Sequence, residues 1–133
     1  TNQQGIRKGL MSENDLLFLH QRMIKEVEKA SGKIDKIYFC PHLKNQKCNC
    51  RKPKSGLFKQ AILELNIDLN SSCMIGDNDS DIEAATSIGC KAIKISDNFS
   101  FDNAVEKILN YFIRFYGRLV GPFVFKKINF YQK

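Results

Sequence analysis

The sequence predicts an α/β protein built on a parallel β-sheet with flanking helices. Short apolar runs at residues 36–40, 73–75 and 90–95 alternate with segments of helical periodicity. Strands that alternate with helices are typical of βα units, in which the strands lie parallel. The length of 133 residues suits one domain with a single hydrophobic core.

The first half of the chain is expected to form a loop, a helix and a strand. Glycines mark residues 1–11 as a loop. Ser12 and Asp15 have the spacing of a helix capping box, so a helix is predicted over residues 12–30. The strand at residues 36–40 follows this helix. The apolar face of the helix is formed by Leu16, Leu19, Met23 and Val27.

The second half of the chain continues the alternation of helices and strands. Helices are predicted over residues 56–65, 80–88 and 101–111, separated by the two later strands. Gly89 directly follows the middle helix, where a glycine commonly ends a helix in the left-handed conformation.

Polar residues follow two of the predicted strands at one edge of the sheet. Arg51 and Lys52 come after the first strand and its loop, and Asp77 follows the second strand. Ligands of open parallel sheets bind beyond the carboxyl ends of the strands. We therefore expect these three side chains to line a common crevice.

The net charge of +7 does not by itself demand a nucleic-acid partner. Residues 111–133 carry five basic and no acidic residues, so the other 110 residues have a net charge of only +2. The sequence has no apolar run long enough for a membrane span and no signal peptide. Five cysteines without secretory features indicate a reducing, cytoplasmic location. We also expect a monomer.

Residues 111–133 differ in composition from residues 1–110 and are treated as a separate tail. The tail holds eight of the fourteen aromatic residues, and Gly117 and Gly121 interrupt any long helix there. It is either an additional packing segment or an attachment to a membrane surface or a partner through aromatic and basic side chains.

A cluster of metal-ligand residue types occupies eleven residues directly before Arg51. Two short spacings joined by a loop suit a tetrahedral zinc ion, and four protein ligands leave no open position for chemistry. The alternative is that the cysteines are core residues and the histidine lies in a loop. A disulfide between Cys48 and Cys50 is not expected, because a one-residue spacer would strain it. Cys73 and Cys90 lie in apolar runs and are predicted to be buried thiols. The cluster consists of Cys40, His42, Cys48 and Cys50.

Three carboxylates, Asp77, Asp79 and Asp81, lie at a predicted strand-to-helix turn. Carboxylates at the end of a strand suit a hard cation such as Mg²⁺. The alternative is that Asp79, Ser80 or Asp81 caps the following helix. Both interpretations hold if Asp77 binds the metal and a later residue forms the cap.

The basic residues beside the cluster could bind an anion. Lys52 can neutralise a phosphate or a nucleophilic carboxylate, and Arg51 can form a two-pronged contact with phosphate or sugar oxygens. Thr1 and Asn2 offer a hydroxyl and an amide as neutral phosphate donors. On their own the two cations would be solvated surface charges, but the adjoining metal loop favours a functional role.

Three motifs carry a resemblance to a known family: T-N-Q-x-G-I-x-x-G, C-P-H-x5-C-x-C-R-K-P-x-x-G and M-I-G-D-x-x-S-D-I-E-A-A. Residues 1–110 resemble the haloacid dehalogenase-type phosphatases, and more closely the heptose-bisphosphate phosphatase and histidinol-phosphatase group. The resemblance implies a Rossmann-like sheet, an aspartyl-phosphate mechanism, and Mg²⁺ and structural Zn²⁺ as cofactors. It implies that Thr1, Lys52 and Arg51 are catalytic residues that also bind the substrate. Thr1 and Lys52 would stabilise the phosphoryl group, and Arg51 would contribute to substrate recognition. Asp77 would bind Mg²⁺, and Asn2, Gln3, Gln4 and Asn78 would complete the substrate site.

The chain departs from the family pattern in two places. The D-x-D-G-T strand that carries the nucleophile should precede Thr1 and is absent, so we expect a sheet incomplete at the N-terminus and no turnover by this chain. Asn78 stands where the heptose enzymes often have lysine. The short loop between His42 and Cys48 resembles the histidinol branch, whereas G-L-F-K-Q-A and S-D-I-E-A-A resemble the heptose branch, which we favour.

The resemblance therefore implies a phosphomonoester hydrolase that removes the 7-phosphate of D-glycero-D-manno-heptose 1,7-bisphosphate, a small phosphorylated sugar. Histidinol-phosphate phosphatase is the alternative enzyme. A zinc-stabilised binding module without catalysis is the alternative of another class.

Overall fold

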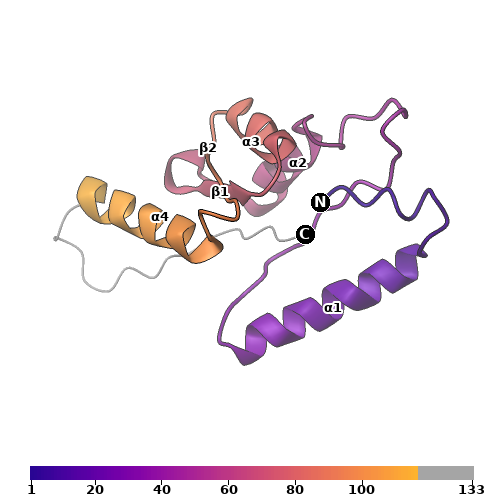
Figure 1. Ribbon diagram of the computed structural model, residues 1–133, viewed down its shortest axis with the longest axis horizontal. Coiled ribbons are helices and arrows are strands. Elements are labelled where there is room, and N and C mark those ends of the chain that lie inside the picture. The colour runs from indigo at the N-terminus through magenta and orange to yellow at the C-terminus, as the bar shows by residue number, and fades with distance from the viewer. Residues whose placement is uncertain (117–133) are drawn as a thin grey trace.

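Two parallel strands form the centre of the computed structural model, which describes residues 1–116 (Figure 1). Strand β1 (Cys73–Gly76) pairs with β2 (Lys91–Lys94), and helix α3 (Asp79–Thr86) connects them. The predicted parallel sheet with flanking helices is confirmed. Gly89 has a φ of +76°, as predicted for a residue that follows a helix end.

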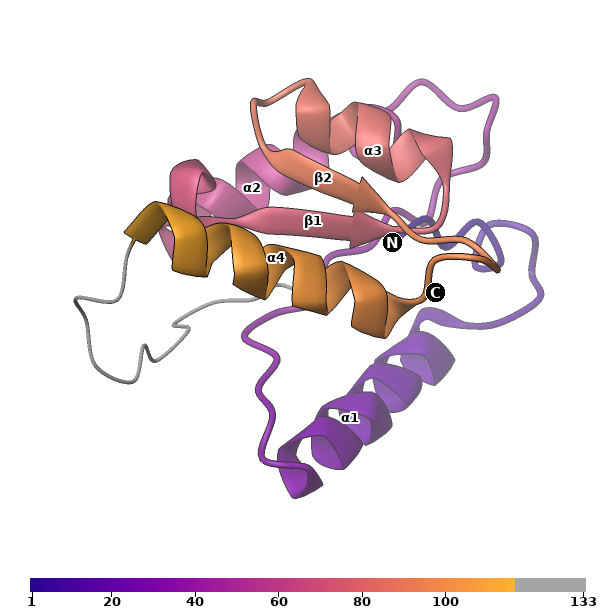
Figure 2. The ribbon, with the colours of Figure 1, turned by 60° about the vertical axis from the view of Figure 1, so that its left-hand side comes forward.

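The helices cover both faces of the strand pair. Helices α2 (Gly56–Leu65) and α3 lie on one side, and α4 (Phe101–Tyr116) lies on the other (Figure 2). Successive side chains of β1 serve the two sides in turn, because a strand directs alternate residues to opposite faces. Met74 packs in the cluster with α3, and Ile75 packs against α4.

The predicted strand at residues 36–40 is wrong in extent. Only Cys40 forms a bridge, with Asn2, although the extended backbone has three hydrogen bonds in parallel register with the start of the chain. The Thr1 nitrogen donates to Tyr38 O (2.7 Å), Cys40 N–H donates to Thr1 O (2.8 Å), and Gln3 N–H donates to Cys40 O (2.8 Å). A ladder can be no longer than its partner, and the partner segment turns away after Gln3. The predicted loop at residues 1–11 therefore begins with a short paired segment.

Helix α1 (Glu13–Lys29) begins with the predicted capping box. Ser12 N–H donates to Asp15 Oδ2 (2.9 Å), and Asp15 N–H donates to Ser12 Oγ (3.1 Å). The predicted apolar face is buried only at Leu16, while Leu19 is 50% exposed. Figure 1 shows this helix set apart from the strand pair.

The boundary expected at residue 110 falls inside a helix. Helix α4 continues past the predicted end at residue 111 to Tyr116, so the first tail residues extend it. The remainder of the tail, residues 117–133, lies outside the described residues, and the prediction of an attachment segment falls there. Within residues 1–116, no helix has the length and apolar character needed to cross a membrane.

Glu64 joins α2 to the extended segment before the metal cluster. Lys36 Nζ (2.5 Å) and Tyr38 Oη (2.8 Å) donate to Glu64 Oε2, and Gln60 Nε2 donates to Oε1 (2.8 Å). These bonds, that from Lys36 first, lower the pKa of Glu64 from 4.5 to about 2. A lowered pKa stabilises the folded state above the unfolded value, so this contribution is lost as the pH falls from 4.5 toward 2.

Replacing Lys36 should therefore make the free energy of unfolding less dependent on pH at acidic pH. Lys36→Ala is expected to reduce the loss of unfolding free energy between pH 4.5 and about 2, measured by urea denaturation at each pH. Lys59→Ala, which removes an exposed lysine of α2 instead, should keep the original profile. Identical profiles for the Lys36 variant and the unaltered chain would contradict this assignment.

Candidate functional site

The four predicted metal ligands come together around one point. Nδ1 of His42 lies 3.4 Å from Cys40 Sγ and 3.2 Å from Cys50 Sγ. Cys40 Sγ lies 3.1 Å from Cys50 Sγ and 3.9 Å from Cys48 Sγ, and all four ligand atoms lie within 4.8 Å of one another. Tetrahedral zinc with bonds of about 2.0–2.3 Å would separate its ligands by roughly 3.5–3.8 Å. The residues present therefore fit zinc.

The loop that carries these ligands packs directly on the start of α2. Cys40 is fully buried in a cluster with Tyr38, Leu57 and Ala61, and the other two thiols pack against that cluster. Gly56 N–H donates to the Asn49 carbonyl (3.0 Å), and a Cβ at residue 56 would lie 2.2 Å from that oxygen. The glycine thus permits a contact that positions the metal loop against the helix.

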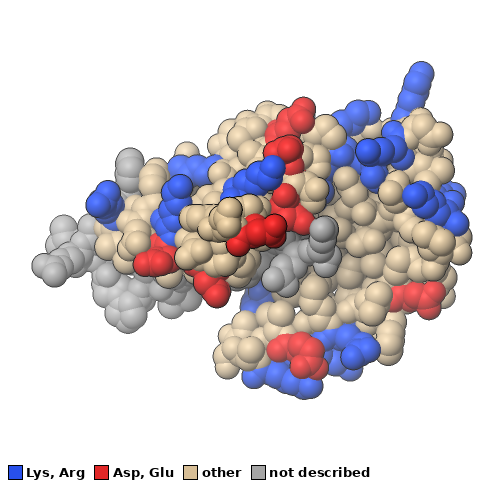
Figure 3. All heavy atoms as spheres, in the orientation of Figure 1, with Lys and Arg blue, Asp and Glu red and all other residues tan. Residues whose placement is uncertain are grey.

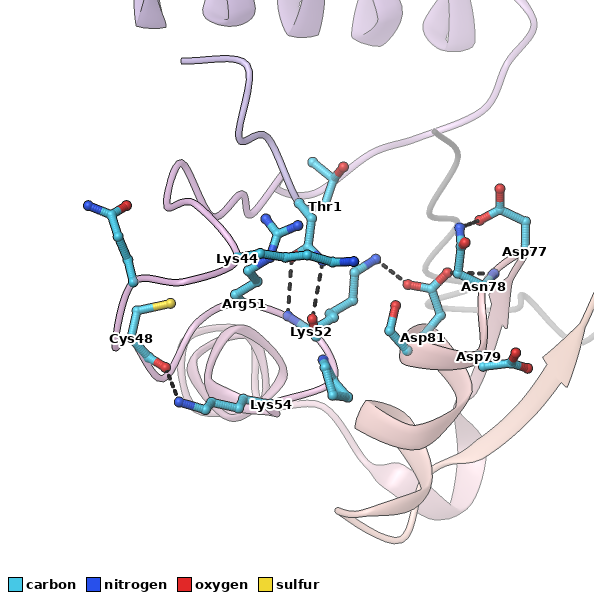
Figure 4. A pocket seen from close by; sticks show the side chains of 14 residues that line it. Thr1, Lys44, Cys48, Arg51, Lys52, Lys54, Asp77, Asn78, Asp79 and Asp81 are labelled. Carbon is cyan, nitrogen blue, oxygen red and sulfur yellow. Dashed lines mark hydrogen bonds and ion pairs between the residues drawn. The ribbon is translucent and has the colours of Figure 1, made fainter. Parts of the chain in front are cut away.

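A cavity of about 670 Å³ lies between the metal loop and the turn from β1 to α3 (Figure 4). Basic side chains gather on the metal-loop side of the molecule and acidic ones on the side of α3 (Figure 3). The crevice predicted at the strand ends is therefore present. Its lining includes the predicted site residues Thr1, Asn2, Arg51, Lys52, Asp77 and Asn78.

Gln3 and Gln4 do not line this cavity, although both were expected in the substrate site. The Gln3 amide instead donates to Thr1 Oγ1 (3.2 Å). The hydrophilic lining residues that were not singled out from the sequence are Lys44, Gln46 and Lys54. Their position between or just after the metal ligands was the available signal, because the ligands fix the path of that loop.

The centre of the cavity is an ion pair between Lys52 and Asp81. The two side chains are only 12% and 4% exposed, and the ammonium contacts Asp81 Oδ1. The other carboxylate oxygen accepts a hydrogen bond from Asn78 N–H (3.1 Å). Asp81 is thus the capping-box partner of Asn78, which is the N-cap residue of α3, whereas the cap itself was predicted at residues 79–81. A Cβ on Gly76 would lie 2.4 Å from Asp81 Cβ, so the strand must end in glycine for this carboxylate to fit.

The neighbouring basic residues are tied to the metal loop. Arg51 Nη1 donates to His42 O (3.1 Å), and Lys54 Nζ donates to Cys48 O (2.5 Å). Each bond joins a cavity cation to the main chain of a metal ligand. The geometry of the metal centre therefore sets where these positive charges lie.

Asp77 follows β1 at the edge of the cavity and is exposed. Its Oδ1 accepts a hydrogen bond from Asn78 Nδ2 (2.7 Å). Asp79 pairs instead with Lys94 on β2 (2.5 Å). Within residues 1–116 only the cysteine–histidine cluster brings three or more metal-ligand groups together, so the three aspartate carboxylates do not converge on one point. Magnesium commonly takes one or two carboxylates, with waters and phosphate oxygens as its other ligands, and Asp77 fits that role.

The chain is similar to a known family of hydrolases and to several of its members. A family model described as "HAD-hyrolase-like" matches residues 49–109. D-glycero-alpha-D-manno-heptose-1,7-bisphosphate 7-phosphatase of Campylobacter jejuni is 42% identical over 119 residues, which cover 84% of this chain and 68% of that protein. The chain belongs to the haloacid dehalogenase-like hydrolases. Within them it belongs to the heptose-bisphosphate phosphatase and histidinol-phosphatase group, as the motifs indicated.

Other relatives of this hydrolase chain agree with that assignment. The bifunctional histidine-biosynthesis protein HisB of Blochmanniella floridana is 40% identical over 94 residues, covering 71% of this chain and 26% of that protein. The crystal structure of D,D-heptose 1,7-bisphosphate phosphatase from B. bronchiseptica, complexed with magnesium and phosphate, superimposes with a TM-score of 0.65 at 33% identity. That match covers 69% of this chain and 51% of the other. The hydrolase chain thus spans about half to two thirds of the length of the heptose phosphatases it matches.

Of the two remaining cysteines, Cys73 begins β1 and Cys90 directly precedes β2. Cys90 is buried and Cys73 is half-buried. Burial raises the pKa of Cys73 to about 11, and it also raises the pKa of Cys90. Both thiols therefore stay protonated near neutral pH and suit a packing role.

Proposed function

We propose that the protein is a magnesium-dependent phosphomonoester hydrolase that removes the 7-phosphate of D-glycero-D-manno-heptose 1,7-bisphosphate. The observation that supports the proposal is the cavity whose lining combines Lys52, Arg51 and Thr1 with Asp77. The Campylobacter relative with that name supports the substrate. A cytoplasmic location and a monomeric state remain predictions.

The lining residues suit phosphoryl transfer, in which catalysis consists mainly of positioning and charge stabilisation. Lys52 would bind the transferring phosphoryl oxygens, and the Thr1 hydroxyl would donate to one of them. Arg51 would contact the remainder of the substrate, since a guanidinium can donate two parallel hydrogen bonds to an anion. Magnesium held by Asp77 would neutralise charge that develops on the phosphoryl oxygens.

We further propose that the nucleophilic carboxylate comes from the D-x-D-G-T segment that the family resemblance places before Thr1. Asp81 is a poor candidate for that role because it is buried against Lys52 and also accepts the Asn78 N–H. Chain 1–133 alone should therefore bind phosphate without hydrolysing a phosphomonoester.

Histidinol phosphate is the second candidate substrate. The similarity to HisB favours it, as does Asn78 at the position beside the magnesium-binding aspartate. Histidinol phosphate carries an imidazole and one phosphate, whereas the heptose bisphosphate carries a sugar ring and two phosphates. The kcat/KM values for the two compounds therefore distinguish the two candidate functions.

The test is phosphate release by the product of the complete reading frame that encodes this chain, with Mg²⁺ and each substrate in turn. We expect a higher kcat/KM for the heptose bisphosphate. Lys52→Ala should lower kcat on the order of 100-fold or more, as loss of a donor to developing charge commonly does. Cys73→Ala, on the opposite side of β1 from Met74 and outside the cavity lining, should keep the activity. Equal activity of the Lys52 variant would contradict the role given to Lys52, and phosphate binding without any hydrolysis would favour a binding module.

A further inference from the structure

We infer that Asn2 is a positioning residue that holds the main chain of Lys52, and that it need not contact the substrate. The motif resemblance placed Asn2 among the substrate-binding residues. The structure shows its amide engaged elsewhere. The inference rests on the proposed function, because it concerns how Lys52 is presented to a phosphoryl group.

The side-chain amide of Asn2 binds both polar groups of one distant residue. Lys52 N–H donates to Asn2 Oδ1 (3.1 Å), and Asn2 Nδ2 donates to Lys52 O (3.3 Å). The two residues are 50 positions apart in the chain, and both bonds are partly buried. A primary amide offers donor hydrogens and an acceptor oxygen, and this arrangement uses both kinds of group. Two bonds to the same residue fix both its position and its orientation.

Asn2 is itself anchored beside the metal centre. Its neighbours Thr1 and Gln3 form the two backbone hydrogen bonds to Cys40 that make the isolated bridge. Cys40 is one of the four clustered ligands and has no exposed surface. The amide thus connects the bridge at the metal loop to the main chain of the cavity lysine.

Lys52 is consequently held at both ends. Asn2 holds its main chain, and Asp81 contacts its ammonium group, which leaves the side chain only 12% exposed. A site that stabilises charge loses effectiveness when a key group is displaced by about 1 Å, so support of this kind affects function. Loss of the Asn2 amide should free the Lys52 backbone while leaving the ammonium intact.

The experiment is a double-mutant cycle on phosphate binding by chain 1–133 loaded with zinc. Inorganic phosphate is titrated in the presence of Mg²⁺, and the Kd is read from amide shifts in NMR spectra. Asn2→Ala should weaken binding on the order of 10-fold when Lys52 is present, the size of one charge-assisted hydrogen bond. In the Lys52→Ala background it should cause no further loss, because residues that act through one another are non-additive. Equal weakening in both backgrounds, or none in either, would overturn the inference.

Asn103→Ala is the matched control. Asn103 Oδ1 also accepts a backbone N–H, that of Ser100 (3.0 Å), but at the start of α4 and outside the cavity lining. This control should lower stability through loss of a cap without changing the Kd for phosphate. A higher Kd for phosphate in the Asn103 variant would show that a general loss of stability explains the effect of the Asn2 substitution.

Hydrogen exchange of the Lys52 amide separates this inference from the proposed function. Exchange of the Lys52 amide should be faster in Asn2→Ala. Asn2→Asp keeps the acceptor oxygen and should restore part of the protection. It can replace Asn2→Ala if that variant does not fold. An unchanged exchange rate of the Lys52 amide in these variants would contradict the role of Asn2 in holding the Lys52 main chain. No phosphate binding by the unaltered chain, with protected Lys52 exchange, would instead contradict the proposed function.

Discussion

Removal of zinc is expected to lower the melting temperature of the protein by on the order of 10 °C or more. Structural zinc sites contribute up to about 10–16 kcal/mol of apparent binding free energy, because the ligands are brought together only in the folded state. Here Cys40 belongs to the buried cluster with α2, and the loop packs on Gly56. A loss of only about 3 kcal/mol would already lower the melting temperature by this amount in a chain of this size.

The measurement is thermal melting with and without a chelator, combined with metal analysis. Hydrogen exchange should rise over residues 40–54, whereas β1, β2 and α4 should keep their protection because they pack in separate clusters. Cys48→Ser should abolish the response to chelation, and Cys73→Ser, which removes a thiol outside the cluster, should retain it. Melting that is unchanged by chelation, in protein found to be free of zinc, would contradict a structural metal.

The parts of the fold and site that depend on local sequence were predictable. The capping box of α1, the bounds of α2 and the left-handed Gly89 all follow from residues a few positions apart. The metal cluster is also local, because short spacings within one loop limit how far apart its ligands can lie. Strand–helix alternation was sufficient to predict that Lys52 and Asp77 line one cavity.

The features that sequence reasoning missed depend on contacts across long stretches of chain. The strand expected at residues 36–40 is limited by the length of its partner, which its own residues do not encode. Asn2 has the chemistry of a phosphate donor, and only the fold shows that Lys52 occupies its amide. Asp81 was predictable as a helix cap, but its second role depends on a lysine that lies 29 positions earlier in the chain.

Breaking the buried ion pair of the cavity should have the second large effect on stability. Removal of one partner of a buried pair leaves an uncompensated charge, at a cost of about 3–5 kcal/mol. Lys52→Met would leave the Asp81 carboxylate without its cation at 4% exposure, and Asp81→Asn would leave the ammonium without its anion. We therefore expect each single variant to lower the free energy of unfolding by most of this amount, as measured by urea denaturation.

The double variant Lys52→Met/Asp81→Asn should be more stable than the sum of the two single losses predicts, because it leaves neither charge buried alone. The pair formed by Lys94 and Asp79 provides the matched control, with the same chemical groups at 45% and 88% exposure. Exposed pairs contribute only about 0–1 kcal/mol, so Lys94→Met and Asp79→Asn should each change stability little. If the Lys52 and Asp81 variants cost no more than these two, the cavity pair is as well hydrated as a surface pair. In that case Lys52 would not lie in a site shielded from water, and the electrostatic role proposed for it would lose its physical basis.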